Sequence, residues 1–414
     1  MKCRVCEGQN IKCVWEMLGH TPSKQLFKQK QEQYCQWDMR LNACEQCGFL
    51  QISEPLSAKV LYANYLFPTS WKLHPHAKSL LARLCELAPS GSKICELGCN
   101  DGAFLYELQS ALASEVAVGI EPSKDVYTLA KDRGLNVIND FFNLSLADSL
   151  CSQYGSFDVI YSRHVFEHIE DLASFLEGIK KLCHKQSVVM IEVPNCQNAI
   201  ESGDISIFWE EHLSYFTPAH LIYTLEKYGF SIMESREYEF SGESLVCFAR
   251  VRESGDSKNI ESMDFTSHFA PYTQAALGFS HIATKRLDSL LSIMQSIKAQ
   301  NRSILAYGGG GGHSMIDFIN LYAKKYVDYV IDDERQKQGY ILPDCGKEII
   351  GFDMLSQVEA KSVGLVLLGT YKENEENILG KCRNVLPKDV MYIPLYTPSS
   401  LQSISNLHKG ANNE

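Results

Sequence analysis

The segment Lys93–Leu105, KICELGCNDGAFL, decides the fold of this 414-residue chain. It reads as an apolar strand, an acidic residue, a loop containing Gly98 and Gly102, and the start of an amphipathic helix. Glycines let the backbone of such a loop approach a ligand closely. Glu121, in the segment VAVGIEPS, ends the next predicted strand, where a carboxylate can accept hydrogen bonds from both ribose hydroxyls. The loop and the carboxylate together predict an adenosine-binding site.

Around this segment, helical periods alternate with short apolar runs from Ala77 to about Arg250, which predicts a parallel sheet with crossover helices. FDVIYS and SVVMIEVP read as further strands, and Ser244–Val251 reads as a late edge strand. After a polar linker at Asp256–Met263 and a helical pattern from 265 to about 300, a second alternating series begins. Its apolar runs are SILAYGGGGG, YVDYVIDD, VGLVLLG and MYIPLY. The fold class expected is therefore α/β, with two such sheets.

The composition limits the functions to consider. Hydrophobic residues make up 45% of the chain and charged residues 21%, as in an ordinary folded protein. No apolar run approaches the roughly 20 residues that span a bilayer, and 15 scattered cysteines are typical of reduced thiols, so we expect a cytoplasmic protein without a membrane partner. Fifty acidic and 39 basic residues give a net charge of −11, which disfavours nucleic acid as a partner.

Two cysteine pairs dominate residues 1 to about 57, where long apolar runs are few and something other than a core is expected to hold the chain. Each pair, Cys3-x-x-Cys6 and Cys44-x-x-Cys47, can present two thiolates to one tetrahedral ion, which predicts structural Zn²⁺ bound by four sulfurs. The alternatives are incidental pairs or a redox motif, although the βαβ context of a redox motif is absent. Three residues inside the gap are possible substitute ligands: Cys13, His20 and Cys35.

Two loops after predicted strands concentrate reactive side chains. Ser162–Ile169, SRHVFEHI, matches the H-x-x-E-H signature of one metalloprotease class, but it follows a strand of an α/β sheet rather than lying on a protease helix. One of its histidines is expected to be structural and the other to face the substrate. Ser206–Pro218, SIFWEEHLSYFTP, is denser still and is too rich in chemically able groups for a simple connection.

The glycine loop resembles that of class I S-adenosylmethionine-dependent methyltransferases, whose E-x-G-x-x-x-G pattern matches Glu96–Gly102. The resemblance implies that Gly98–Asp101 contact the methionine part of the cofactor. It also implies that the turn VINDFF places two residues beside the adenine. The cofactor-binding residues implied are Glu96, Gly98, Asn100, Asp101, Gly102, Glu121, Pro122, Asp140, Phe141 and Arg163.

Taken with the cysteine pairs, the loop Trp209–Phe216, WEEHLSYF, resembles the Y-x-E-H-x-S-Y-F-type loop of tri-domain sugar C-methyltransferases. The resemblance implies that His212 is the base, with Glu211 beside it and His168 also in the site. Trp209 replaces the usual tyrosine and cannot ionise, which puts an acid role for that position in doubt. A family tyrosine in the preceding linker falls near Tyr65 or Phe67.

The family implies three parts: a zinc module and linker (1–75), a class I methyltransferase Rossmann-like domain (76–255) and a C-terminal Rossmann-like domain (256–414). The expected substrate is a nucleotide-diphosphate keto-deoxysugar held between the last two parts. Its ketone lets a base remove the α proton and leave an enolate that takes the methyl group.

Two other interpretations of the whole chain remain open at this stage. The chain could be an O- or N-methyltransferase of another small molecule, or a zinc-organised binding protein without activity. In the C-terminal domain, the five-glycine turn and Asp332-Asp333 are reminiscent of a nicotinamide site, but His313 stands at the third glycine position. A helix N-terminus there suits a sugar diphosphate, and a purely structural role is the alternative.

Overall fold

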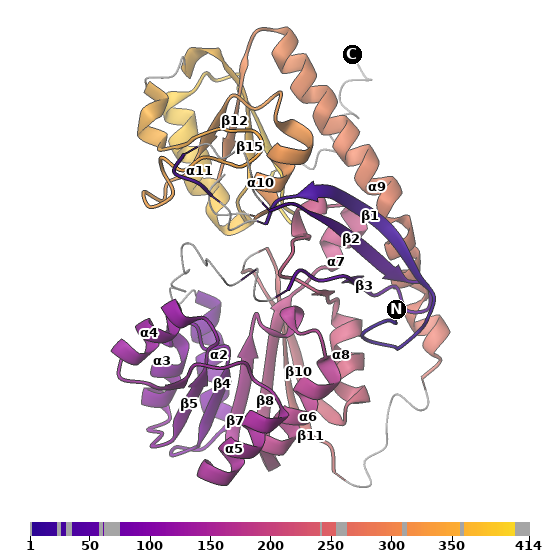
Figure 1. Ribbon diagram of the computed structural model, residues 1–414, viewed down its shortest axis with the longest axis vertical. Coiled ribbons are helices and arrows are strands. Elements are labelled where there is room, and N and C mark those ends of the chain that lie inside the picture. Colours follow the sequence, from indigo (N-terminus) through magenta and orange to yellow (C-terminus); the bar gives the residue numbers. More distant parts are fainter. Residues whose placement is uncertain are drawn as a thin grey trace.

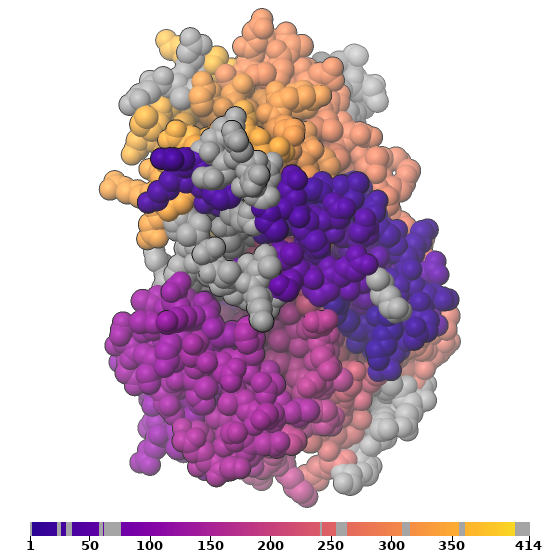
Figure 2. Space-filling model, viewed as in Figure 1, coloured from indigo at the N-terminus to yellow at the C-terminus, as the bar shows by residue number. Residues whose placement is uncertain are grey.

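The computed structural model describes residues 2–22, 26–29, 35–57, 61, 75–240, 242–253, 263–308, 313–356 and 360–401. These residues form three sheets that lie one after another along the long axis of the molecule (Figure 1). The small N-terminal sheet lies between the two larger α/β parts, and the space-filling view shows its surface seated between them (Figure 2). No helix in these ranges is long and apolar enough to cross a membrane.

The central sheet has seven strands in the order β10-β11-β8-β7-β4-β5-β6. Pairing is parallel from β6 to β8, and β11 pairs antiparallel with both β8 and β10. The predicted edge position of the strand at Ser244–Val251 is wrong, because β10 pairs with its outer side. Its six consecutive buried residues agree with an internal strand. The strands are β4 (Ile94–Leu97), β5 (Ala117–Ile120), β6 (Asn136–Ile138), β7 (Phe157–Arg163), β8 (Cys183–Pro194), β10 (Phe230–Tyr238) and β11 (Ser244–Val251).

Helices cover both faces of the central sheet, as crossover connections between parallel strands require. One face carries α2 (Pro75–Leu87), α3 (Ala103–Ala111) and α4 (Lys124–Asp132), which contribute Leu84, Leu105 and Ala130 to the core there. The other face carries α5 (Leu144–Tyr154), α6 (Leu172–Leu182) and α8 (Pro218–Lys227). The short elements η1 (Phe166–His168), α7 (Gln197–Ser202) and η2 (Ile205–Ile207) follow β7 and β8 at the edge where parallel strands end.

The N-terminal part is a four-stranded sheet in the order β1-β2-β3-β9. Its strands are β1 (Ile11–His20), β2 (Trp37–Cys44), β3 (Leu50–Ile52) and, from far along the chain, β9 (Ser214–Tyr215). The expectation that this part lacks a core is wrong, because Met39 and Leu41 pack in a buried cluster with Phe208 and Phe279. The sequence hid this core since its other half comes from later segments.

The C-terminal sheet is parallel throughout, in the order β14-β13-β12-β15-β16. Its strands are β12 (Ser303–Tyr307), β13 (Tyr329–Ile331), β14 (Ile349–Ile350), β15 (Val363–Leu368) and β16 (Met391–Pro394). The 35-residue helix α9 (Phe265–Ala299) contacts β1, β2, β12 and β15, so it ties this part to the N-terminal sheet. The remaining elements are α10 (His313–Phe318), η3 (Ile319–Ala323), η4 (Phe352–Ser356), η5 (Ala360–Ser362) and α11 (Lys372–Val385). The predicted α/β class with a second Rossmann-like domain is thus confirmed.

Candidate active site

The loop between β4 and α3 has the conformation that its glycines predicted. Gly98 and Gly102 have φ angles of 77° and 75°, in the left-handed region that side chains rarely adopt. A Cβ at Gly98 would lie 2.3 Å from Cγ2 of Val165, and one at Gly102 would lie 2.2 Å from Cδ1 of Leu135. The loop therefore has glycine where the backbone turns and where neighbouring side chains leave no room.

Glu121 fixes this loop from the end of β5. Its carboxylate accepts hydrogen bonds from the backbone N–H groups of Asn100, at 2.9 Å, and Ser123, at 2.8 Å. Burial raises the pKa of Glu121, and these two amides oppose that rise. In β4, Glu96 accepts a hydrogen bond from the Tyr161 hydroxyl at 3.0 Å, and burial raises its pKa to about 8.

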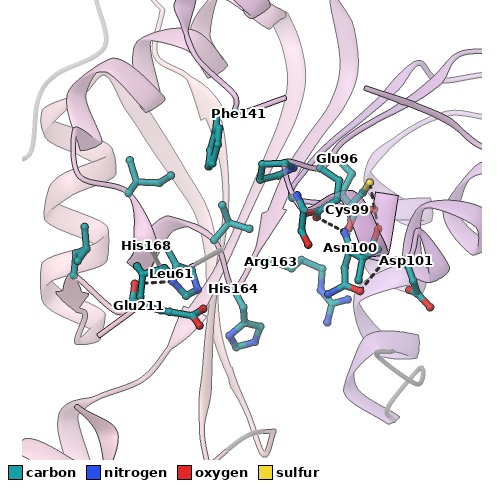
Figure 3. Close-up of a pocket in the computed structure, with 18 of the residues that line it drawn as sticks. Leu61, Glu96, Cys99, Asn100, Asp101, Phe141, Arg163, His164, His168 and Glu211 are labelled. Carbon is teal, nitrogen blue, oxygen red and sulfur yellow. Dashed lines mark hydrogen bonds between the residues drawn. The ribbon is translucent and has the colours of Figure 1, made fainter. Parts of the chain in front are cut away.

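A cavity of about 650 Å³ opens beside the loop. Figure 3 shows Asn100 and Asp101 at one end, His168 and Glu211 at the other, and Arg163 and His164 between them. Eight of the ten predicted cofactor residues line it: Glu96, Gly98, Asn100, Asp101, Glu121, Pro122, Phe141 and Arg163. The other two, Gly102 and Asp140, are not among the described lining residues. Gly102 is the N-cap of α3, and Asp140 accepts a hydrogen bond from the N–H of Phe141.

Arg163, the last residue of β7, lines the cavity. Its Nε lies 2.6 Å from a carboxylate oxygen of Glu192, and its guanidinium lies 4.4 Å from the ring centroid of Phe104. Glu192 also lies 3.0 Å from Nε2 of His76. Burial disfavours the charge on Glu192, but Arg163 and His164 outweigh it and hold the pKa of Glu192 well below its usual range. Arg163 is thus held as a partly buried cation at the cavity wall.

Two of the four predicted catalytic residues, His168 and Glu211, line the far end of the cavity. Nδ1 of His168 lies 2.7 Å from the backbone carbonyl oxygen of Glu211. Because a carbonyl oxygen can only accept a hydrogen bond, Nδ1 carries the hydrogen. In a neutral His168, Nε2 therefore has a lone pair that can accept a proton. Both histidines of the earlier loop line the cavity, so the expected division into one structural and one substrate-facing histidine does not separate them by position.

His212 and Trp209 lie next to His168 and are not among the described lining residues. The ring centroid of His212 is 4.8 Å from that of His168 and 4.5 Å from that of Trp209. Nε2 of His212 lies 3.8 Å from the carboxylate of Glu167, the acidic residue of the H-x-x-E-H match. The contact joins residues from two different loops, so no local pattern could have shown it. Tyr65 and Phe67 lie outside the described residues.

Glu210, the remaining acid of this loop, joins a buried triad. Nε2 of His20 lies 2.9 Å from Glu210, and Nδ1 of His20 lies 3.0 Å from Asp317 in α10. Burial alone would lower the pKa of His20, but the two carboxylates raise it to about 10. His20 is thus an ion-pair partner that connects three parts of the chain, rather than a substitute ligand for the cysteines.

The four predicted metal ligands come together at the base of the N-terminal sheet. One thiol atom from each of Cys3, Cys6, Cys44 and Cys47 lies within 4.8 Å of every other. The backbone N–H groups of Gly8 and Gln46 donate to the sulfurs of Cys6 and Cys44, both at 3.4 Å. Amide donors of this kind stabilise thiolates, so the donor set fits a closed tetrahedral metal site.

In the C-terminal part, Asp332 and Asp333 follow β13 as predicted. Asp333 accepts a hydrogen bond from the Tyr307 hydroxyl and pairs with Lys381, while Asp332 accepts one from the N–H of Glu334. The turn at 309–312 lies outside the described residues. Among the residues that are described, none from the C-terminal sheet lines the cavity.

The fold and the site define a class I S-adenosylmethionine-dependent methyltransferase. A family model described as a methyltransferase domain matches residues 72–235, and one described as a C-methyltransferase C-terminal domain matches residues 242–387. The curated C-methyltransferase NovU of Streptomyces niveus is 25% identical over 312 residues, which span 72% of this chain and 73% of NovU. These matches support the resemblance to the sugar C-methyltransferases that the sequence predicted.

Solved structures similar to this chain cover a smaller part of it. A methyltransferase from Anabaena variabilis is 16% identical, with a TM-score of 0.36, over 44% of this chain and 86% of its own. The magnesium protoporphyrin IX methyltransferase of Synechocystis PCC 6803, solved with bound S-adenosylmethionine, is 16% identical, with a TM-score of 0.32, over 43% of this chain and 78% of its own.

Proposed function

We propose that this C-methyltransferase acts on a nucleotide-diphosphate-linked keto-deoxysugar through an enolate intermediate. One observation carries the proposal: a single cavity has the cofactor loop at one end and His168 with Glu211 at the other. A methyl donor over Gly98 and a proton acceptor can therefore meet the same small substrate. Methylation of a carbon needs both, whereas an oxygen or nitrogen nucleophile already carries its lone pair.

The described residues fit the cofactor. S-adenosylmethionine supplies an electrophilic methyl group on a positively charged sulfur. Asp101 and Glu121 line the cavity and favour a cation there, while the partly buried guanidinium of Arg163 suits a carboxylate. The half-exposed ring of Phe141 offers a surface on which an adenine can stack.

The proposed base belongs to the His168–His212 pair. His212 takes that role by resemblance, and the ring of His168, which lines the cavity, lies with its centroid 4.8 Å from that of His212. Removal of the α proton converts an imidazole to imidazolium and leaves the C–H electron pair in an enolate. Glu211 lines the same end of the cavity, and Trp209 replaces a tyrosine that the family carries, so an indole N–H there can donate but cannot transfer a proton.

The other two parts are proposed to support this reaction. The four cysteines are proposed to bind structural Zn²⁺, because all four positions are filled by thiolates and none is open for catalysis. The C-terminal domain is proposed to hold the nucleotide diphosphate, with the boundaries 1–75, 76–255 and 256–414. Support for this assignment is the sequence resemblance and the match to a C-methyltransferase C-terminal domain.

The test is a product assay with the full-length protein. Candidate 4-keto and 3-keto nucleotide sugars are incubated with S-adenosylmethionine, and mass spectrometry locates the added methyl group. We expect a branched sugar, and we expect deuterium from D₂O to enter the carbon next to the ketone even without the methyl donor. Methylation of hydroxyl or amino groups with no reaction at carbon would overturn the proposal.

His212→Asn and His168→Asn test which of the two histidines accepts the α proton. Loss of the proton acceptor should lower the exchange rate by about a hundredfold or more, while affinity for S-adenosylmethionine by calorimetry stays near the wild-type value. His220→Asn is a matched comparison, because His220 is buried between Cys47 and Thr217 and does not line the cavity. Its loss should affect stability rather than exchange.

A further inference from the structure

A buried carboxylate lies directly behind the reactive end of the cavity. Glu167 is the middle residue of η1, and its side chain is 1% exposed. Among the described residues, neither of its carboxylate oxygens has a hydrogen-bond partner. Burial of a carboxylate without hydrogen bonds costs free energy, so its surroundings must favour the charge in another way.

Three imidazoles surround this carboxylate. From its Oε1 atom, Nδ1 of His164 lies at 3.5 Å, Nε2 of His212 at 3.8 Å and Nε2 of His168 at 4.0 Å. They come from the end of β7, from the Trp209–Phe216 loop and from η1 itself. Burial and the negative charge of Glu167 raise the pKa of the Cys196 thiol at the start of α7, so this neighbour is uncharged.

His164 and the other two histidines have different surroundings. Nε2 of His164 lies 3.4 Å from Glu192 and 3.0 Å from the Ser244 hydroxyl. Burial disfavours its charge, but Glu192 and Glu167 outweigh burial and raise the pKa of His164 to about 9. His164 is therefore a cation that lies between two carboxylates, Glu192 and Glu167. Because it is shared, it neutralises Glu167 only in part, and the remaining negative charge acts on the other two imidazoles.

The hydrogen bond of His168 decides where a new proton goes. Its Nδ1–H already donates to the carbonyl of Glu211, so a further proton must bind Nε2, which is the atom that faces Glu167. Nε2 is also the atom of His212 that faces Glu167. A positive charge formed on either ring thus lies about 4 Å from a buried negative charge.

We propose that Glu167 is a positioning residue for C-methylation: its carboxylate orients the His168–His212 pair and stabilises the imidazolium that forms when the pair takes the α proton. The proton leaves the substrate carbon, its electron pair stays in the enolate, and one neutral imidazole becomes a cation. After methyl transfer the proton passes to solvent and the pair is neutral again. The role in turnover rests on the proposed function, whereas the electrostatic coupling is measurable without any substrate.

The first experiment measures that coupling. Full-length protein labelled with ¹⁵N-histidine is titrated by NMR as wild type and as Glu167→Gln, which keeps the shape and removes the charge. We expect the titration midpoints of the His168–His212 pair to fall by about one pH unit, because a nearby opposite charge favours the imidazolium. Signals of His220 and His184, which pair with other groups, are internal references that should not move. Unchanged midpoints for both His168 and His212 would overturn the proposal.

Glu167→Asp keeps the charge but withdraws it by one methylene. We expect a smaller shift in the same direction, and this variant still decides the question if Glu167→Gln fails to fold. In turnover, Glu167→Gln should lower kcat about tenfold or more and move the acidic limb of the pH profile downward, with the affinity for S-adenosylmethionine unchanged. Glu211→Gln is the comparison variant and should move that limb less. An NMR shift without methylation of any keto sugar would support the coupling and contradict the proposed function.

Glu167, His168 and His212 could instead bind a metal ion. One donor atom from each of Glu167, His168 and His212 lies within 4.8 Å of the others, and two imidazoles with a carboxylate can bind a divalent transition metal. Metal analysis of the purified protein separates the two cases. We expect one ion per chain, for the four cysteines, in wild type and in Glu167→Gln alike. A second ion that is lost in Glu167→Gln would overturn the proposal.

Discussion

Single glycines control how closely the cofactor loop approaches its ligand, and Gly98 can be tested against a matched position. Gly98 and Gly134 have φ angles of 77° and 82°, but a Cβ at Gly134 would meet no heavy atom within 4 Å. Gly134→Ala should therefore cost only the backbone strain of about 1 kcal/mol. Gly98→Ala adds a collision with Val165 and should weaken binding of S-adenosylmethionine by more than about tenfold. Calorimetry and thermal melting measure the two effects, and equal affinities would contradict this explanation.

Two adjacent phenylalanines separate binding from stability. Phe141 lines the cavity and is 52% exposed, whereas Phe142 is partly buried and packs on Phe175 with ring centroids 5.4 Å apart. Phe141→Ala should weaken cofactor binding by about 1 to 2 kcal/mol and leave unfolding almost unchanged. Phe142→Ala should do the reverse and cost about 2 to 3 kcal/mol of stability. Cofactor affinity is measured by calorimetry and stability by urea unfolding. If Phe141→Ala lowered stability and left the affinity unchanged, Phe141 would have no part in binding.

The residues that could be predicted from the sequence are those whose function depends on their neighbours in the chain. Gly98 and Glu121 sit at fixed positions relative to strands, so a local pattern was enough to place both at the cavity. The contact between Glu167 and His212 depends instead on how two loops meet in space. The resemblance indicated His212 and Glu211, but it did not indicate the buried carboxylate of Glu167 near His212.

At the level of elements, the short strand β9 matters more than its length suggests. Leu50 of β3 pairs with Tyr215 of β9, and the N–H of Leu213 donates to the carbonyl of Glu167. The loop with Glu211 and His212 is therefore held between the N-terminal sheet and η1. Strands of the central sheet were readable from apolar runs, but β9 was not, because its partner strand lies in another part of the chain.

The cysteine cluster should influence catalysis through β9. We expect one zinc ion per chain, and its removal by a chelator should loosen β2 and β3 and then the loop that pairs with them. C-methylation should fall at least tenfold while affinity for S-adenosylmethionine is retained, because the cofactor loop belongs to the central sheet. Metal release, product formation and calorimetry are measured on the same samples.

Two cysteine variants provide the control for this prediction. Cys47→Ser removes a ligand of the cluster, whereas Cys13→Ser changes an exposed cysteine of β1 that lies outside it. Only the first should lose metal and activity. Equal activity of the two variants would show that the cluster does not support the loop.

In the whole molecule, one buried triad joins three parts of the chain. His20 ends β1, Glu210 lies in the Trp209–Phe216 loop and Asp317 belongs to α10, and all three side chains are at most 4% exposed. The imidazolium of His20 bridges these two buried carboxylates. From the sequence, His20 was a possible zinc ligand, because its neighbours in the chain do not indicate partners as distant as Glu210 and Asp317.

The triad predicts how stability depends on pH. The pKa of His20 is raised to about 10 in the folded protein, against an ordinary value of about 6.5 in the unfolded chain. The stabilisation is therefore complete below pH 6.5 and is lost as the pH rises toward 10. His20→Asn should cost about 3 to 5 kcal/mol at pH 6.5 and less at pH 9.5, measured by urea unfolding.

His184 provides the comparison for His20. It pairs with Asp158 at 3.0 Å, but both side chains are about a third exposed. Solvent-exposed ion pairs contribute little, so His184→Asn should change the unfolding free energy by less than about 1 kcal/mol at either pH. A constant difference between wild type and His20→Asn across this pH range would show that the triad does not carry the predicted charge.

The pairing of β3 with β9 also sets an order of events during synthesis. Residues 50–52 leave the ribosome long before Tyr215 exists, so the N-terminal sheet has an open edge until most of the methyltransferase domain has been made. The parallel strands β4 to β8 precede β9 in the chain and do not need it for pairing. The cofactor loop therefore precedes the reactive loop in the chain, and the edge of β3 has no partner strand until β9 has been made.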